Sequence, residues 1–500
     1  MPAPSQTGLR RNLSVWQAVG LSVALMAPSM AANINPQPTI AQVGRGVPLA
    51  FLLAAIGVLL VGWGFVRLCQ YYQHAGSVYA FVGLTLGPRT GVVSGLALFA
   101  TYTFYGVVTS SAAGLFFSAF LDELGVWHHP PSWQPFLFAA IALALAVLLT
   151  VVPARRGTTT LLSIEGATVA LILVVSIVVL VRVIAHHAPD GGKQHFTLSV
   201  FTVSPGLGAS AVFLGVVFGF LSFAGFEAAS TLGEETANPR RDIPRAILGT
   251  AIFGGVYFVI VTAIEVMGFG TDDSGLQAFA GSSSLLGDLG TRYIGEWVGD
   301  LISLGASISA FGCCLACVVG ASRLLFAMQR DAIGGERGLA TLTRNGTPAR
   351  AALVVAVLMV VAAVVMVACG GLVITNTFAW SGVMGTLILL VAYVLTTIGA
   401  IRLVFVQKRM PVATWQIVIP ILALVVLGYT LYRNVFPYPT EGPARFFPVV
   451  AGAWVVLSVV AVLAAPGLAA KLGRALAADE GFATEREGTD PGMPRLGHVS

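Results

Sequence analysis

Twelve long apolar runs divide this chain, and each is long enough to cross a lipid bilayer as a helix. A membrane-spanning helix needs about 20 predominantly apolar residues. Inside lipid every backbone polar group must find a partner within the protein, so runs of this length fold as helices. The sequence therefore predicts an all-α integral membrane protein with twelve transmembrane helices. The predicted spans are 15–41, 48–68, 91–120, 134–153, 161–185, 207–232, 245–268, 297–328, 350–369, 372–405, 412–432 and 446–465.

The charge content excludes a soluble globular protein. Only 10% of the 500 residues are charged, and the mean hydropathy is +0.87. A soluble domain is about a quarter charged, so these charges are too few to cover a water-facing surface. The net charge of +5 does not indicate nucleic-acid binding, because the basic residues lie between the apolar runs. There they orient the chain in the membrane.

The distribution of Lys and Arg predicts the orientation. With the N-terminus in the cytoplasm, most of the 27 basic residues fall in loops on that side. Cytoplasmic loops of membrane proteins carry such an excess. We therefore expect a multi-pass protein of the cytoplasmic membrane, with both termini cytoplasmic. The exceptions, on the outer side, are Arg45, Arg182, Lys193, Arg292, Arg433 and Arg445.

The two ends of the chain differ from its apolar body. Residues 1–13 form a polar cytoplasmic segment, and the apolar run after it contains no clear small-residue cleavage site. We interpret that run as a retained first helix rather than a signal peptide. Residues 14–465 are predicted to form the membrane domain. Residues 466–500 are polar and rich in Gly, Pro and charge, which predicts a disordered cytoplasmic tail.

No motif predicts a metal, a cofactor or an enzymatic reaction. Cys313 and Cys317 share a helical face, a spacing that suits either a metal or small packing residues. No His or carboxylate lies near them in the sequence, so packing is the better interpretation. The chain also has no phosphate-binding loop of the kind that drives ATP-powered pumps.

Two of the spans are interrupted. The first contains three prolines, each of which removes a backbone donor, and the sixth contains Glu227 shortly after Gly225. A carboxylate at membrane depth faces a bundle interior or a cavity, and non-helical backbone survives only in such places. The first span also carries three polar side chains. These six residues are Pro28, Pro36, Pro38, Asn33, Asn35 and Gln37.

Interruptions in spans one and six, five spans apart, suit a fold of two inverted five-helix repeats. The repeats would cover about 14–185 and 207–405, with two extra helices in 412–465. In such folds the paired broken helices form the substrate site near the middle of the membrane. The alternative is a proline kink in span one and a buried structural Glu227 in span six.

Three stretches resemble the amino acid–polyamine–organocation permeases. They are residues 218–247, with Phe223-Ala224-Gly225-Phe226-Glu227 at their centre, residues 321–331, and residues 73–88. The resemblance extends over about 14–465. It implies a leucine-transporter-type fold of ten core helices plus two. It also implies uptake or exchange of amino acids or related amines by alternating access.

The first-helix motif departs from that family. The family's motif is rich in glycine, whereas this chain has Ala27-Pro28-Ser29-Met30-Ala31-Ala32. These residues are mostly small, so the backbone can still approach a ligand.

The family's mechanism implies a site between the two breaks. Backbone amides after the first break, with the Ser29 hydroxyl, would hold a substrate carboxylate, and carbonyls of 220–224 would hold its ammonium. Aromatic side chains such as Tyr105 would select the substrate, although core packing explains them equally well. The candidate binding residues are Ala27, Ser29, Met30, Ala31, Ala32, Tyr102, Phe220, Phe223, Ala224 and Trp380.

Three further residues are candidates for coupling or gating. Glu227 would bind and release a proton, because a carboxyl group removed from water takes up a proton more readily. Glu165, the only ionisable residue in the body of span five, is the second, or it pairs with Arg155 or Arg156. In proton-coupled relatives a basic residue on helix five can substitute for a sodium ion, and a Glu there reverses that charge. Arg323 would close an inward gate, or is a solvated capping charge. Glu265 is expected to reach the outer interface.

The sequence thus predicts a secondary transporter, a proton symporter, for an amino acid or a related amine. A polyamine permease should have several acidic residues that face inward. This chain has few candidates, Glu227 and Glu165, so an amino acid with a single amino group is favoured. An amino acid exchanger remains an alternative. A sensor that binds solute without moving it is the alternative of another class, although such a chain is expected to carry a soluble signalling domain.

Overall fold

The computed structural model describes residues 14–72, 77–127, 130–151, 155–189, 194–232, 236–333, 338–343, 347–439, 442–464, 467 and 471. These residues form helices and no β-strand. The predicted N-terminal segment, residues 1–13, and nearly all of the predicted tail lie outside them. The α-helices are α1 (Val15–Met26), α2 (Pro28–Ile34), α3 (Pro36–Val43), α4 (Val47–Tyr71), α5 (Ser77–Leu86), α6 (Pro88–Glu123), α7 (Gln134–Val151), α8 (Arg155–Ile184), α9 (Val212–Phe223), α10 (Pro239–Phe269), α11 (Asp273–Gly281), α12 (Leu285–Tyr293), α13 (Glu296–Ile333), α14 (Ala349–Gly370), α15 (Ile374–Ile401), α16 (Val418–Val435) and α17 (Phe446–Ala464).

Twelve helical segments in the described ranges are long and apolar enough to cross a membrane, which confirms the predicted number of spans. They are Val15–Ile34, Pro36–Tyr71, Pro88–Glu123, Gln134–Val151, Thr160–Ile184, Ala209–Leu232, Pro239–Phe269, Glu296–Arg330, Ala349–Gly370, Ile374–Val406, Thr414–Val435 and Pro443–Ala464. The boundary between the first two spans was predicted too late. The first ends at Ile34, and α3 leads through a short 3-10 turn, Gly44–Gly46, into α4.

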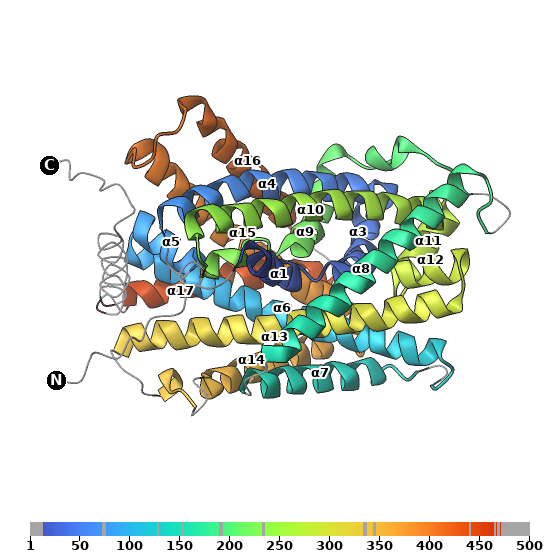
Figure 1. Cartoon of the computed structure of the whole chain (residues 1–500), viewed down its shortest axis with the longest axis horizontal. Coiled ribbons are helices and arrows are strands. Elements are labelled where there is room, and N and C mark those ends of the chain that lie inside the picture. The colour runs from blue at the N-terminus through green and yellow to red at the C-terminus, as the bar shows by residue number, and fades with distance from the viewer. Residues whose placement is uncertain are drawn as a thin grey trace.

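The long helices lie side by side in one bundle (Figure 1). The most extensive packing joins α6 to α13 and to α15, and α4 to α10. The short helices α1 and α9 lie among them, and α14, α16 and α17 expose most of their side chains. Figure 1 shows α5 at one end of the bundle and α11 and α12 at the other. The core therefore surrounds the two spans whose helices are interrupted.

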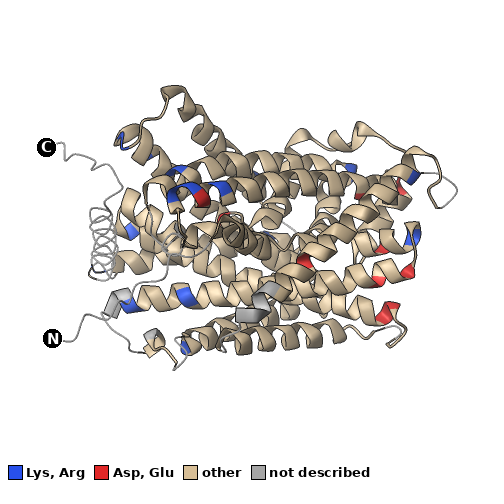
Figure 2. Cartoon of the chain, viewed as in Figure 1, with Lys and Arg blue, Asp and Glu red and all other residues tan. Residues whose placement is uncertain are grey.

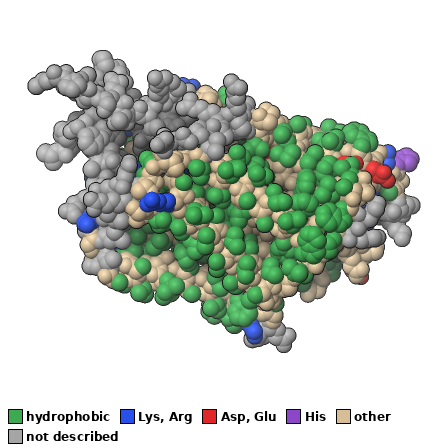
Figure 3. All heavy atoms as spheres, turned by 90° about the horizontal axis from the view of Figure 1, so that it is seen from below, with side chains coloured by type: hydrophobic (Ala, Val, Ile, Leu, Met, Phe, Trp, Pro, Cys, Tyr) green, Lys and Arg blue, Asp and Glu red, His purple; other side chains and the backbone are tan. Residues whose placement is uncertain are grey.

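Charge and hydrophobicity divide the surface as a bilayer requires. Lys and Arg gather at the end of the bundle that carries α5, and Asp and Glu are most frequent near the opposite end (Figure 2). Between the ends, hydrophobic side chains cover a broad band of the face seen in Figure 3. Exposed apolar side chains on the outer helices include Leu148, Ile177 and Val364. A band of this extent is stable only against lipid.

Candidate functional site

The first span changes direction at Ala27. Helix α1 ends at Met26, Ala27 is left-handed with φ 44° and ψ 60°, and α2 begins with Pro28. A residue before proline is driven out of the α region, and Pro28 has no N–H to continue the ladder. The left-handed region costs an alanine about 1–2 kcal/mol. The surrounding packing offsets that cost, since Ala27 is almost fully buried.

The sixth span is interrupted at Ala224 and Gly225. Helix α9 ends at Phe223, Gly225 has φ 103°, and the chain resumes as a 3-10 turn, Ala228–Leu232. A Cβ atom on Gly225 would lie 2.6 Å from the Cβ of Leu25. The glycine thus permits both the backbone turn and direct contact with the end of α1. The two interruptions therefore touch each other.

Hydrogen bonds hold the two interrupted segments together. The Ser22 hydroxyl donates to the carbonyl of Phe226 at 3.1 Å and accepts from the N–H of Ala229 at 3.0 Å. The Cys313 thiol on α13 donates to the carbonyl of Leu25 at 3.0 Å. These bonds satisfy backbone groups that the interruptions release from helical pairing.

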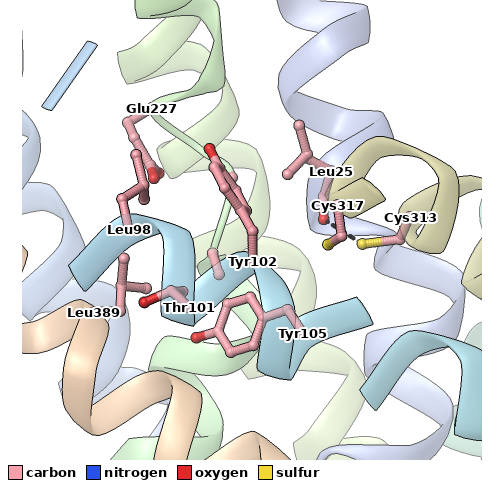
Figure 4. A pocket seen from close by; sticks show the side chains of 11 residues that line it. Leu25, Leu98, Thr101, Tyr102, Tyr105, Glu227, Cys313, Cys317 and Leu389 are labelled. Atoms are coloured by element: carbon pink, nitrogen blue, oxygen red, sulfur yellow. Dashed lines mark hydrogen bonds between the residues drawn. The ribbon is translucent and has the colours of Figure 1, made fainter. Parts of the chain in front are cut away.

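A small cavity lies beside this contact (Figure 4). It leaves about 10 Å³ of free space, room for a single water molecule. The Tyr102 and Glu227 side chains point into it from α6 and from the turn after α9. Its lining consists of Leu25, Leu98, Thr101, Tyr102, Tyr105, Ala224, Gly225, Glu227, Cys313, Cys317 and Leu389.

The cavity carries one carboxylate, and its lining residues include no Lys, Arg or His. Glu227 is 5% exposed, and its Oε2 atom has no hydrogen-bond partner among the residues that the structure describes. The Tyr105 hydroxyl is already bonded to the Thr386 hydroxyl at 2.9 Å. A buried carboxylate oxygen without a hydrogen-bond donor is energetically costly, so this lining is suited to a cation or a proton.

Three of the four predicted carboxylate-binding amides after the first break have partners inside the protein. The Ser29 hydroxyl is buried and has no partner within the described ranges. Ala32, in the same turn, is fully buried. Three backbone N–H groups donate hydrogen bonds here. They run from Ser29 to Glu165 Oε1 (2.9 Å), from Met30 to Ser309 Oγ (3.3 Å) and from Ala31 to the carbonyl of Ala27 (2.8 Å).

The polar side chains of the first span reach neighbouring segments. Asn33 Oδ1 accepts from the Ser284 hydroxyl at 3.1 Å, and Asn35 Nδ2 donates to the Ser222 hydroxyl at 2.7 Å. Gln37 Nε2 donates to two backbone carbonyls just before α12. These side chains therefore tie the first span to α9 and to the α11–α12 region.

Three predicted aromatic contacts do not line the cavity. Phe223 is buried edge-on against Phe258, with the ring centres 5.3 Å apart. Phe220, also buried, lies close to Gly57 on α4. Trp380 packs on Phe447 of α17, with the ring centres 6.1 Å apart.

Two predicted charges lie in different surroundings. Arg323 is exposed on α13. The expectation that Glu265 reaches the outer interface is wrong. Its side chain is fully buried, and neither carboxylate oxygen has a partner within the described part of the chain. Position along a helix predicts depth in the membrane, but not which face of the helix meets its neighbours.

Sequence reasoning missed most of the apolar lining. Leu98 and Thr101 share the α6 face of Tyr102 and Tyr105, at spacings of three and four residues that place them together. This periodicity was available in the sequence. No comparable pattern marks the other lining residues, because an apolar residue in a membrane helix faces lipid, core or cavity with equal ease. These residues are Leu25, Cys313, Cys317 and Leu389.

Comparison with known proteins agrees with this architecture. The family model for amino acid permeases matches residues 33–466. The chain is 26% identical to the low-affinity putrescine importer PlaP of Escherichia coli K12, covering 66% of this chain and 70% of that protein. It is 26% identical to the branched-chain amino acid permease BcaP of Bacillus subtilis, over 58% and 61%. It is 24% identical to cationic amino acid transporter 4 of Mus musculus, over 72% and 56%. The chain therefore belongs to the amino acid permease family and is a multi-pass membrane transporter rather than an enzyme.

Proposed function

We propose that this permease moves an amino acid or a related amine across the cytoplasmic membrane by alternating access, coupled to protons. The observation that carries the proposal is the buried carboxylate of Glu227, whose Oε2 atom has no partner among the described residues, in a cavity between two interrupted spans. The named substrates of the relatives, putrescine and branched-chain or cationic amino acids, all carry a protonated amino group. The chemical group that these substrates share is therefore an ammonium ion.

The substrate ammonium binds at Glu227. A buried carboxyl oxygen without a hydrogen-bond donor is costly, and an ammonium ion supplies such donors. The Tyr102 side chain, which points into the same cavity, selects the remainder of the substrate. Because the cavity holds only about 10 Å³, α1 and the turn after α9 must separate before the substrate enters.

Proton coupling follows from the same residue. In the empty site Glu227 has no cationic partner among the lining residues, so it takes up a proton. An arriving ammonium ion donates a hydrogen bond to this protonated carboxyl group, so the proton and the substrate cross the membrane together and in the same direction. Amino acid exchange without protons, or a sodium ion held by backbone carbonyls, are the alternatives for the energy source.

The proposal includes an orientation and an internal symmetry. Both termini are cytoplasmic, and the two inverted repeats cover about 14–185 and 207–405, with 412–465 added. The gathering of Lys and Arg at the bundle end that carries α5 supports this orientation (Figure 2). Direct contact of the interrupted spans one and six supports the repeat.

The test is uptake by purified protein in liposomes. Labelled amino acids and diamines are supplied with and without an inward proton gradient, for the wild type and for Glu227→Gln, which preserves side-chain shape. We expect gradient-driven accumulation in the wild type and at least a tenfold loss in the variant, with unchanged thermal unfolding.

Other outcomes are equally informative. Accumulation that persists in Glu227→Gln would remove this residue from the mechanism. Accumulation that needs an internal amino acid and ignores the gradient would identify an exchanger. Thermal stabilisation by a solute that is never taken up would favour a non-transporting sensor.

A further inference from the structure

Glu165 lies on α8, in the fifth span, and its side chain is 5% exposed. Its Oε1 atom accepts a hydrogen bond of 2.9 Å from the backbone N–H of Ser29, in the first turn of α2. The side chains of Arg155 and Arg156, the alternative partners, lie outside the described residues. Among the described residues, Glu165 is bonded to the first interrupted span.

This contact occupies the position that a substrate carboxylate would need. A carboxylate bound after the first break would use the amides of Ser29 and Met30, since Pro28 has none. Glu165 takes the first amide, and the Ser309 hydroxyl on α13 takes the second at 3.3 Å. The protein therefore supplies its own carboxylate at this point.

A second carboxylate lies on the other side of the same break. Glu227 lines the cavity together with Leu25, in the last turn of α1, and its Oε2 atom is buried without a partner among the described residues. Ala27 thus separates a turn in contact with Glu165 from a turn in contact with the Glu227 cavity. The cavity lining contributes no basic side chain that could balance the two acids.

We propose that Glu165 determines substrate specificity by excluding carboxylates, so that this permease prefers amines that lack a carboxylate group. A substrate carboxylate would find the Ser29 N–H already bonded to Glu165, and it could bind there only by displacing that buried side chain and leaving it without this partner. An amine without that group does not need the Ser29 N–H, so it binds at Glu227 and leaves the bond to Glu165 in place. This inference rests on the proposed function and narrows its substrate class to cationic amines.

The wild-type protein provides a test that needs no variant. Uptake and thermal stabilisation are measured for pairs of compounds that differ only in the carboxylate. The pairs are lysine with cadaverine, and leucine with 3-methylbutylamine. We expect the amine of each pair to be taken up at least tenfold faster than the amino acid at equal concentration. Equal or greater uptake of the amino acids would overturn the inference.

Variants at Glu165 identify the residue responsible. Glu165→Gln keeps an acceptor for the Ser29 N–H and removes the charge, and Glu165→Ala also frees the amide. We expect the amine-to-amino-acid ratio to fall in both, and by tenfold or more in Glu165→Ala. The matched control is Glu265→Gln, which removes another buried carboxylate, one on α10 that does not line the cavity, and should leave the ratio unchanged.

The outcomes separate this inference from the proposed function. The role of Glu165 is overturned if the ratio is unchanged in folded, active Glu165 variants, or if it falls equally in the control. Either result leaves the proposed transport function standing. Failure of both members of every pair to bind or to enter the liposomes overturns the proposed function itself, and the specificity role with it.

Discussion

Individual side chains near the interruptions differ in how well the sequence predicted their positions. Glu227, Tyr102 and Ala224 line the cavity, and each was marked by an unusual property: a charge, an aromatic hydroxyl or closeness to a glycine. Phe223 is adjacent to Ala224 but turns onto Phe258 instead. The direction of a side chain depends on the orientation of its helix about the helix axis, and that orientation cannot be read from one sequence.

A substitution at Gly225 tests the contact between this residue and Leu25. In Gly225→Ala the new Cβ would lie 2.6 Å from Leu25 Cβ, and φ of 103° is strained for alanine. We expect a loss of about 1–3 kcal/mol of stability, measured as a lower thermal unfolding temperature in detergent, together with reduced uptake. The control is Gly249→Ala, where a Cβ would meet no atom within 4 Å. Unchanged stability and uptake in Gly225→Ala would contradict the described contact.

Among the helices, number and approximate position followed from the sequence, whereas the ends did not. Twelve apolar runs predicted twelve spans because backbone pairing in lipid leaves few other structures. Pro28 and Gly225 marked where two of them are interrupted. The early end of the first span at Ile34 was missed. Asn33, in that span, and Asn35, just after it, bond to Ser284 and Ser222 far along the chain, and the local sequence does not show those partners.

The attachment of α1 to the sixth span depends on one hydroxyl. Ser22→Ala leaves the carbonyl of Phe226 and the N–H of Ala229 without this partner. A lost buried hydrogen bond costs about 1–3 kcal/mol, so we expect a lower unfolding temperature and slower uptake. Ser458→Ala is the matched control, because the Ser458 hydroxyl bonds only to a carbonyl of its own helix at Trp454. Equal effects of the two changes would argue against a special role for Ser22.

For the protein as a whole, the sequence predicted a membrane transporter, and the family match confirms it. Composition alone was sufficient for the membrane, since 10% charge cannot cover a soluble surface of this size. The inverted repeat and the orientation remain predictions. The repeat depends on the arrangement of helices far apart in the sequence, and the orientation depends on the surrounding membrane. Neither can be read directly from one sequence.

Orientation is testable by labelling in intact cells. Cysteine is introduced at Gln407, between α15 and α16, or at Leu207, before α9, after the exposed Cys369 is replaced by Ser. Both positions are exposed. We expect a membrane-impermeant maleimide to label Leu207→Cys and to leave Gln407→Cys unlabelled until the cells are opened. The reverse pattern would place both termini outside.

The small volume of the cavity has a consequence for the cell that makes this protein. Space for one water molecule cannot hold a continuous file of water from one face of the membrane to the other. Water in this cavity therefore offers ions and protons no continuous path between the two faces. The tight contact between Gly225 and Leu25 must therefore open for each substrate molecule, and between such openings it leaves no wide channel at this point of the protein.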